Sequence, residues 1–280
     1  MGFFVSTARK LKHSPRSPIG VFDSGIGGLT VAHAIHQRMP NEQIIYFGDT
    51  AHLPYGDKSE SAIQSYSVKI VNVLLKKGCK VIVIACNSAS SSAYELLKEY
   101  VANKAHIINV IDPMVELVAK QLPGKKVGLI GTKRTVQSGI YPKKIKELSP
   151  MIELHSLATP LLAPMIEEGF YSSQISHEII ASYLSNPIFA SIDALILACT
   201  HYPLIQKEIE EFFENRVTML DSSAVVSHAL ERYLQTQGLA SDQRQSEHHF
   251  MVSDFTEAFE ASTRIFFGEK VKLEWHPLRN

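Results

Sequence analysis

Residues 81–88 of the 280-residue chain are Val81-Ile82-Val83-Ile84-Ala85-Cys86-Asn87-Ser88. The apolar run that opens this stretch has the length of a strand, and a continuous apolar run is typical of a strand buried on both faces of a parallel sheet. A thiol and two hydrogen-bonding side chains follow at once, and the Ser-rich segment after them indicates a helix start. The stretch therefore predicts a buried strand that carries Cys86 at its carboxyl end, where open α/β sheets bind ligands.

A second stretch repeats this pattern later in the chain. Residues 193–199 are Asp193-Ala194-Leu195-Ile196-Leu197-Ala198-Cys199, and Thr200 and His201 follow. Each of these strands is preceded by an earlier strand with glycine at its second position, at residues 19–23 and at residues 127–131. A repeat of this kind indicates two similar structural units, each with a thiol at the same place.

Strand-like and helix-like segments alternate along the rest of the chain. Strands are predicted at residues 18–22, 44–47, 81–85, 107–111, 127–131, 152–157, 194–198, 217–220, 248–252 and 271–275. Such alternation is typical of α/β layers around parallel sheets. We therefore predict two similar three-layer α/β domains with mainly parallel sheets, related by a pseudo-two-fold axis, with the active site in the cleft between them.

The predicted domain boundaries follow from this repeat. The segment after about residue 220 is too short for a third domain, so we expect it to return to the first. The expected divisions are a disordered N-terminal tail over 1–17, a first domain over 18–111 plus 221–280, and a second domain over 112–220.

Composition excludes several classes of protein. The 45% of apolar residues and 20% of charged residues are ordinary for a globular chain. The 28 Lys and Arg balance the 28 Asp and Glu, so we expect no nucleic-acid partner. No run of about 18 apolar residues is present, and Phe3-Phe4-Val5 is too short for a signal-peptide core, so we expect no membrane partner. Three cysteines, an odd and sparse set, fit the reducing cytoplasm.

The two strand-end thiols are the strongest candidates for chemistry. Amide groups and the dipole at a helix start favour a thiolate, so the sequence predicts a pKa for Cys86 below the ordinary value of about 8.5. Two similar domains that face each other would present Cys86 and Cys199 to one cleft, which suits proton removal from one face of a carbon and delivery to the other. Either thiol alone has an alternative interpretation as a small buried hydrophobe. Cys79, at the other end of its strand, is predicted to be structural.

A glycine-rich turn, Asp23-Ser24-Gly25-Ile26-Gly27-Gly28, follows the first strand. Its amides could hold an anion. The spacing departs from the dinucleotide pattern G-x-G-x-x-G, because position 30 is Thr, so nucleotide binding is not favoured. We expect Asp23 to orient an ammonium group or a catalytic partner.

Cofactor signals are weak. The 12 histidines are scattered, and Cys199-x-His201 has no partner cluster at metal spacing, so no metal is expected. Lysine-based pyridoxal chemistry stays open by sequence logic, although no lysine occupies a comparable strand end. These patterns alone therefore identify no particular cofactor.

Taken together, four motifs resemble the glutamate racemases, a cofactor-independent family that makes D-glutamate for bacterial cell walls. The motifs are Phe22-Asp23-Ser24-Gly25-Ile26-Gly27-Gly28, Leu53-Pro54-Tyr55-Gly56, Ala85-Cys86-Asn87-Ser88-Ala89-Ser90 and Ala198-Cys199-Thr200-His201-Tyr202-Pro203. The resemblance runs from about residue 18 to 278. In this order the motifs are specific for the wider aspartate/glutamate racemase group, and the second and fourth favour glutamate. The resemblance also implies a homodimer.

The resemblance implies a role for each matching residue. Cys86 and Cys199 would be acid/base thiols on opposite faces of the substrate α-carbon, assisted by Asp23 and His201. Glu167 would be the acidic residue near the second thiol, with Glu168 as the alternative. The substrate site would be lined by Asp23, Ser24, Tyr55, Gly56, Asn87, Ser88, Thr200 and His201, and a substrate carboxylate would be bound by Thr132 or Thr135.

Two positions depart from the family pattern. Position 88 is Ser where Thr is usual, which keeps the hydroxyl but removes a methyl group from the wall. Position 198 is Ala where Gly is common, and this departure concerns only the space around the backbone at that position.

The predicted function is interconversion of L- and D-glutamate by a two-base mechanism, which supplies D-glutamate for peptidoglycan. The alternative within the family is a racemase for aspartate or another acidic amino acid. An alternative from another class is a sugar- or nucleotide-binding α/β module without catalysis. Two equivalent thiols argue against the binding module, because binding alone does not need them.

Overall fold

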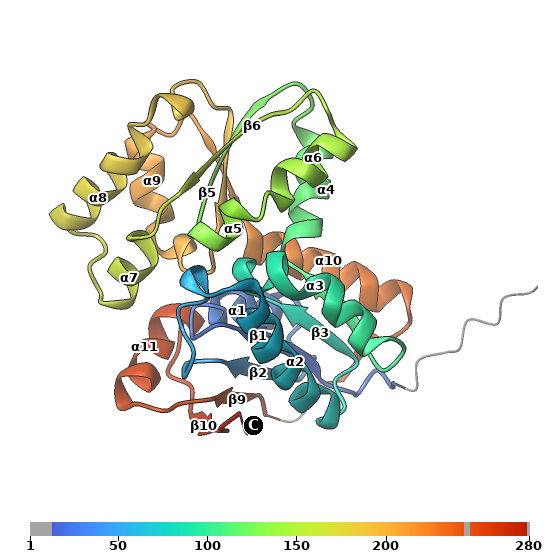
Figure 1. Cartoon of the computed structure of the whole chain (residues 1–280). Coiled ribbons are helices and arrows are strands. Elements are labelled where there is room, and N and C mark those ends of the chain that lie inside the picture. Colours follow the sequence, from blue (N-terminus) through green and yellow to red (C-terminus); the bar gives the residue numbers. More distant parts are fainter. Residues whose placement is uncertain (1–12, 244–246, 279–280) are drawn as a thin grey trace, which may run out of the picture.

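The computed structural model describes residues 13–243 and 247–278 and contains two parallel sheets (Figure 1). The strands are β1 (Ile19–Asp23), β2 (Ile44–Gly48), β3 (Val81–Ile84), β4 (His106–Asn109), β5 (Lys126–Gly131), β6 (Glu153–Ala158), β7 (Ala194–Ala198), β8 (Thr218–Asp221), β9 (His249–Val252) and β10 (Leu273–Trp275). The α-helices are α1 (Leu29–Arg38), α2 (Glu60–Lys76), α3 (Asn87–Val101), α4 (Ile111–Gln121), α5 (Lys133–Gln137), α6 (Ile140–Leu148), α7 (Leu162–Glu167), α8 (Gln174–Leu184), α9 (Gln206–Phe212), α10 (Ser222–Thr236) and α11 (Glu257–Phe267). Short 3₁₀ helices are η1 (Tyr55–Asp57), η2 (Pro187–Phe189) and η3 (Tyr202–Ile205).

The two sheets share one strand order. The first is β10-β9-β2-β1-β3-β4 and the second is β6-β5-β7-β8, and the recorded strand pairs are all parallel. The segment β2-β1-β3-β4 therefore has the same order as the whole second sheet. Phe22 pairs with Ile84, two residues before Cys86, and Ile130 pairs with Leu197, two residues before Cys199. The predicted α/β class with two mainly parallel sheets is confirmed, and both thiols occupy the same register position.

Helices cover both faces of the first sheet because successive strand side chains point to opposite faces. Val21 packs in one buried cluster with α1, α10 and α11, whereas its neighbour Phe22 packs in a second cluster with α2 and α3. The first cluster continues into the second sheet, where it includes Leu129 and Ile196. Helix α10 contacts both α1 and α4, so a continuous apolar core joins the two sheets.

The C-terminal part of the chain extends the first sheet. Strands β9 and β10 continue it beyond β2, with β9 paired to β2. Of the expected N-terminal tail, residues 1–12 lie outside the described residues, whereas residues 13–17 contact the rest of the chain. The buried Lys80 donates from Nζ to the carbonyl of Pro15 and to Glu42 Oε2, each at 2.6 Å. The division into domains stays a prediction.

One predicted strand is too long. The segment 107–111 was expected to be extended, but β4 ends at Asn109 and α4 begins at Ile111. The reason is local, because Asn109 Oδ1 accepts hydrogen bonds from the backbone N–H groups of Ile111 and Asp112, each at 2.8 Å. A side-chain acceptor at this place satisfies the free amides of a helix start.

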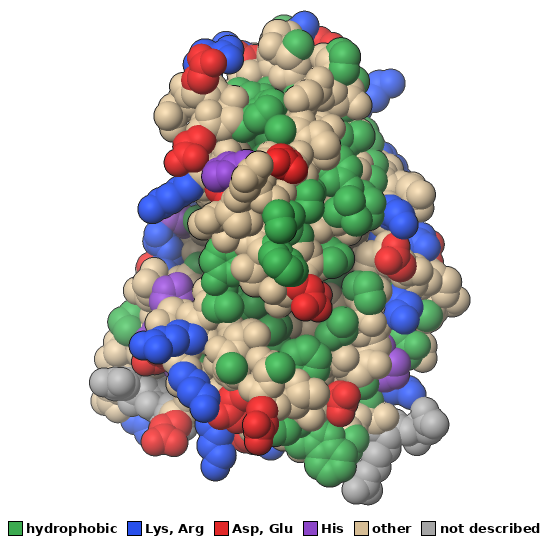
Figure 2. Space-filling view, turned by 90° about the vertical axis from the view of Figure 1, so that its left-hand side faces the viewer, with side chains coloured by type: hydrophobic (Ala, Val, Ile, Leu, Met, Phe, Trp, Pro, Cys, Tyr) green, Lys and Arg blue, Asp and Glu red, His purple; other side chains and the backbone are tan. Residues whose placement is uncertain are grey.

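The surface carries charges of both signs and an apolar region. On the face shown in Figure 2, Lys and Arg side chains are interspersed with Asp and Glu. Hydrophobic side chains gather on the same face, which is the side of α7, α8 and α11 in Figure 1. Exposed large side chains on or beside these helices are Leu161, Phe170, Ile175 and Ile265. Among the helices that the structure describes, none combines the length and apolarity required to cross a membrane.

Candidate active site

One cavity contains both strand-end thiols. It lies at the carboxyl ends of β1, β3, β5 and β7, and its walls come from both sheets. Its lining includes Ser24, Tyr55, Gly56, Cys86, Asn87, Ser88, Thr132, Glu167, Cys199, Thr200 and His201. The sequence-predicted residues therefore meet at a single site, with Asp23 and Thr135 behind it.

Cys86 caps the N-terminus of α3. Its Sγ accepts the backbone N–H of Ala89 at 3.4 Å and lies 3.6 Å from Ser24 Oγ. Burial raises the pKa of the Cys86 thiol to about 12, with a further rise from Asp23, and the helix-start hydrogen bond only partly opposes this. The predicted lowering of its pKa is therefore wrong, because desolvation outweighs the helix terminus.

The backbone amides of the glycine-rich turn bind the side-chain carboxyl group of Asp23, the first residue of the turn motif. Asp23 Oδ2 accepts the N–H groups of Gly25 at 3.2 Å and Gly28 at 2.9 Å. The sequence suggested that the amides of this turn could hold an external anion. The amides of Gly25 and Gly28 instead bind the side chain of Asp23. Burial raises the pKa of Asp23, while His201 and the turn amides oppose the rise. Asp23 is fully buried next to Ser24. It lies close enough to Cys86 to raise the pKa of that thiol, and close enough to His201 for electrostatic interaction with the imidazole.

Cys199 belongs to a chain of three groups. His201 Nδ1 lies 3.6 Å from Cys199 Sγ, and His201 Nε2 lies 2.8 Å from Glu167 Oε1. Burial lowers the pKa of His201, but Cys199 and Glu167 more than offset this, so its pKa lies well above the ordinary value. His201 therefore lies between the thiol of Cys199 and the carboxylate of Glu167. Glu167 lines the cavity, and Glu168 is not among the described lining residues.

Hydroxyl and amide groups form the opposite wall. Ser88 Oγ lies 2.8 Å from Thr132 Oγ1, which lies 3.1 Å from Thr135 Oγ1. Thr132 lines the cavity, while Thr135 is buried behind it and holds its hydroxyl. The Tyr141 hydroxyl donates to Asn87 Oδ1 at 2.9 Å, which directs the amide NH₂ of Asn87 away from that contact. No described residue accepts from this NH₂ group.

Comparison with known proteins gives the family. The family model described as Asp/Glu/Hydantoin racemase matches residues 28–230. This chain belongs to that racemase family. A glutamate racemase of Geobacter metallireducens is 37% identical over 258 residues, which cover 92% of this chain and 95% of that protein.

Solved structures of racemases share the same architecture. The glutamate racemase of Francisella tularensis in complex with D-glutamate superposes with a TM-score of 0.88 at 37% identity, covering 94% of this chain and 98% of that one. Glutamate racemase isoform RacE1 of Bacillus anthracis has a TM-score of 0.88 at 34% identity, covering 94% and 98%. The protein is therefore an isomerase with the racemase fold.

In this racemase, several residues that the sequence analysis did not name as site residues support the side chains around the cavity. Tyr141 fixes Asn87, and the Tyr202 hydroxyl lies 2.7 Å from Thr159 Oγ1. Thr159 directly follows β6 in the place that Asp49 occupies after β2, since Ala158 pairs with Gly131 as Gly48 pairs with Asp23. The internal repeat, extended by one more strand, could have found this pair of positions.

The side chain of His201 is held from two further sides. A Cβ atom at Gly27 would lie 2.4 Å from His201 Cε1 and 2.7 Å from Nδ1, so the backbone of the glycine-rich turn packs directly on the imidazole. The ring of Phe266, on α11, packs edge-on against the other side, with ring centroids 5.3 Å apart. Within the described ranges 13–243 and 247–278, no group of three or more His, Cys, Asp or Glu is arranged to hold a metal ion.

Proposed function

We propose that this racemase interconverts L- and D-glutamate by a cofactor-independent mechanism that uses two thiols. The observation that carries the proposal is the placement of Cys86 and Cys199 at the same register position in two sheets, both lining one cavity. The glutamate specificity draws support from the relatives of this chain, which are called glutamate racemases, and from the D-glutamate complex of the Francisella protein. We include in the proposal a cytoplasmic role in supplying D-glutamate for peptidoglycan.

The reaction needs one thiolate and one thiol at a time. A thiolate removes the α-proton from one face of glutamate, so the C–H bond breaks, an S–H bond forms, and the electron pair stays on the α-carbon. The thiol on the other side then gives its proton to the opposite face, and its S–H pair becomes the new thiolate. His201, held by Glu167, stabilises the thiolate of Cys199. The raised pKa of Cys86 keeps this group protonated in that state, ready to donate.

The carbanion must be stabilised by the protein itself. Hydrogen-bond donors fixed in a cavity that excludes water act strongly on developing charge. The free amide NH₂ of Asn87 and the hydroxyl groups of Ser88 and Thr132 supply such donors on one wall. We propose that they bind substrate carboxylate oxygens, with Thr132 making the contact and Thr135 orienting it.

The first test is activity without any added group. After exhaustive dialysis against a chelator, the protein should racemise glutamate at an undiminished rate, measured by circular dichroism, and show no pyridoxal absorbance. It should also prefer glutamate to aspartate in kcat/KM. Activity that vanishes with the chelator and returns with metal would disprove the mechanism, and equal kcat/KM values for both amino acids would disprove the specificity.

The Ser88→Thr variant tests the wall beside Thr132. The hydroxyl is retained and one methyl group is added to a buried position. A change of this size in a pocket alters kcat/KM by roughly 10- to 200-fold at most, and here we expect less than about tenfold because the hydrogen bond survives. Ser88→Ala is the matched comparison, and it should lose more than Ser88→Thr. The reverse order would show that the hydroxyl does not serve the substrate.

The homodimer implied by the family resemblance stays a prediction. Light scattering of the purified protein at several concentrations measures its mass against the 31.2 kDa of one chain.

A further inference from the structure

Tyr55 lines the cavity, but its hydroxyl group is engaged elsewhere. The side chain is 1% exposed, and its O–H donates to Asp49 Oδ2 at 2.6 Å. Burial, followed by the adjacent Asp49, raises the pKa of Tyr55 well above its ordinary value, so the phenol stays protonated and donates. Its place in the wall therefore depends on the group that receives this hydrogen bond.

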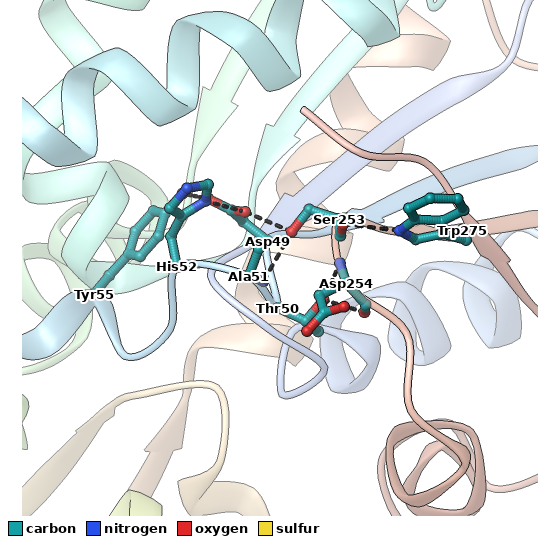
Figure 3. A network of polar contacts seen from close by, with 8 residues as sticks. All are labelled: Asp49, Thr50, Ala51, His52, Tyr55, Ser253, Asp254 and Trp275. Atoms are coloured by element: carbon teal, nitrogen blue, oxygen red, sulfur yellow. Dashed lines mark hydrogen bonds and ion pairs between the residues drawn. The ribbon is translucent and has the colours of Figure 1, made fainter. Parts of the chain in front are cut away.

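Asp49 is a fully buried carboxylate at the end of β2 that is not among the described residues lining the cavity. Besides Tyr55, it accepts from Ser253 Oγ at 2.6 Å through Oδ1, and His52 Nδ1 lies 2.8 Å from the same oxygen. Both of its oxygens are thus filled by donors from three side chains (Figure 3). Such charge-assisted bonds are strong and directional, and a buried carboxylate needs them.

The partner Ser253 comes from the C-terminal part of the chain, directly after β9. Its Oγ also accepts the backbone N–H of Ala51 at 2.9 Å. The next residue, Asp254, exchanges two hydrogen bonds with Thr50 Oγ1, at 2.6 and 2.9 Å. The indole N–H of Trp275, on β10, donates to the carbonyl of Ser253 at 3.2 Å. The segment directly after β9 therefore holds residues 49–51, the first part of the loop that leads from β2 to Tyr55, as Figure 3 shows.

We propose that Asp49 is a positioning residue for the substrate site, which fixes Tyr55 and the adjoining Gly56 in the wall and is itself fixed by Ser253. The inference rests on the proposed function, because its effect is read in glutamate kinetics. Asp49 does not line the cavity, and Tyr55 carries no proton in the reaction. Loss of Asp49 should therefore weaken binding of substrate and transition state together, which raises KM and leaves kcat nearly unchanged.

The test compares Asp49→Asn, Ser253→Ala and Tyr55→Phe with the wild-type protein. Replacing the carboxylate of Asp49 by an amide turns one of its two acceptor oxygens into an NH₂ donor. That NH₂ group would then face the donating hydroxyl of Tyr55 or Ser253. We expect Asp49→Asn to raise KM by about 10- to 100-fold, as for the loss of hydrogen bonds to a charged group, with kcat within about threefold. Ser253→Ala keeps the Asp49–Tyr55 bond and should raise KM less. Circular dichroism melting curves show at which temperature each variant is folded.

A double-mutant cycle separates positioning from general loss of structure. If Asp49 acts through the Tyr55 hydroxyl, Asp49→Asn should raise KM much less in a Tyr55→Phe background than in the wild type. Glu42→Gln is a matched control, since Glu42 is also a buried carboxylate. It binds Lys80, and the two residues lie just before β2 and β3, at the ends of these strands away from the cavity. Glu42→Gln should lower the melting temperature without changing KM. Unfolded molecules reduce the amount of active enzyme, which lowers the apparent kcat but leaves the KM of the folded molecules unchanged.

Each outcome has one meaning. An unchanged KM in Asp49→Asn, or KM effects of Asp49→Asn and Tyr55→Phe that simply multiply, overturns the positioning role while the wild type still racemises glutamate. A wild-type protein that does not racemise glutamate overturns the proposed function, and the inference with it.

Discussion

Cys86→Ala and Cys199→Ala should each lower kcat/KM for glutamate racemisation by at least about 10²–10⁴-fold, the usual contribution of a positioned acid or base. Each replacement removes one of the two thiols that line the cavity and that we propose as proton carriers. L- and D-glutamate have equal free energies in water, so kcat/KM must be equal in the two directions for any variant. Each single replacement should therefore lower kcat/KM by the same factor in both directions, as measured by circular dichroism from either enantiomer.

Cys79→Ala is the control for this pair. Cys79 is also a buried free cysteine, but it lies before β3, at the end of that strand opposite to Cys86. Burial raises its pKa to about 12, as at Cys86, so a raised pKa alone does not mark a reactive thiol here. Cys79→Ala should keep activity within a few fold. Near-normal racemisation by Cys199→Ala would contradict the two-thiol mechanism.

Solvent isotope labelling tests the two-base step directly. In D₂O, starting from L-glutamate, the D-glutamate formed early should carry deuterium at the α-carbon, while the remaining L-glutamate stays largely protonated. In the proposed mechanism, the group that delivers the new hydrogen differs from the group that took the old one. The family resemblance assigns Cys199 to the proton of L-glutamate and Cys86 to that of D-glutamate. Early D-glutamate that retains its original hydrogen would indicate a single base.

Gly27→Ala should lower kcat/KM by about 100-fold, because the added methyl group would displace His201. Its Cβ would lie 2.4 Å from Cε1 of the imidazole, and the ring is already held by Cys199, Glu167 and Phe266. A displacement of about 1 Å of a catalytic group can cost a factor of this size. The loss should appear mainly in kcat, since His201 contacts Cys199, one of the two proposed proton carriers.

Gly25→Ala is a comparison within the same turn. A Cβ at Gly25 would meet only Leu53 Cδ2, at 3.7 Å, which is an ordinary contact. This variant should lose less than about tenfold in kcat/KM. If Gly27→Ala is as active as Gly25→Ala, the packing of the turn on His201 does not control the reaction.

Features that local sequence patterns encode could be predicted. The apolar runs before Cys86 and Cys199 predict buried parallel strands, and the repeat predicts that the two sheets resemble each other. The predicted end of strand β4 lies two residues too far along the chain, because apolar character continues through Ile111 while the side chain of Asn109 starts the helix. The start of α2 shows the same limit, since Asp57 and Ser59 are both candidate caps by residue type, and it is the side chain of Ser59 that accepts from the backbone N–H of Ala62. Neighbouring polar residues compete for a cap, and spacing alone does not decide between them.

Features that depend on distant parts of the chain could not be predicted. The direction of the pKa shift of Cys86 is set by burial, which the helix-start pattern does not reveal. Asp49 receives its hydrogen bond from Ser253, 204 residues later, and Phe266 reaches His201 from α11. These contacts arise because β9 adds to the edge of the first sheet, and pairing of that kind leaves no periodic signal in either segment.

The position of Trp275 also gives the protein an intrinsic fluorophore at a useful place. It is the single tryptophan of the chain, and its indole N–H is bonded to the carbonyl of the residue that holds Asp49. The emission of an indole responds to its hydrogen bonding and to its exposure to water. We therefore expect unlabelled emission titration to detect ligands that shift the loop after β2, including molecules that bind without being racemised.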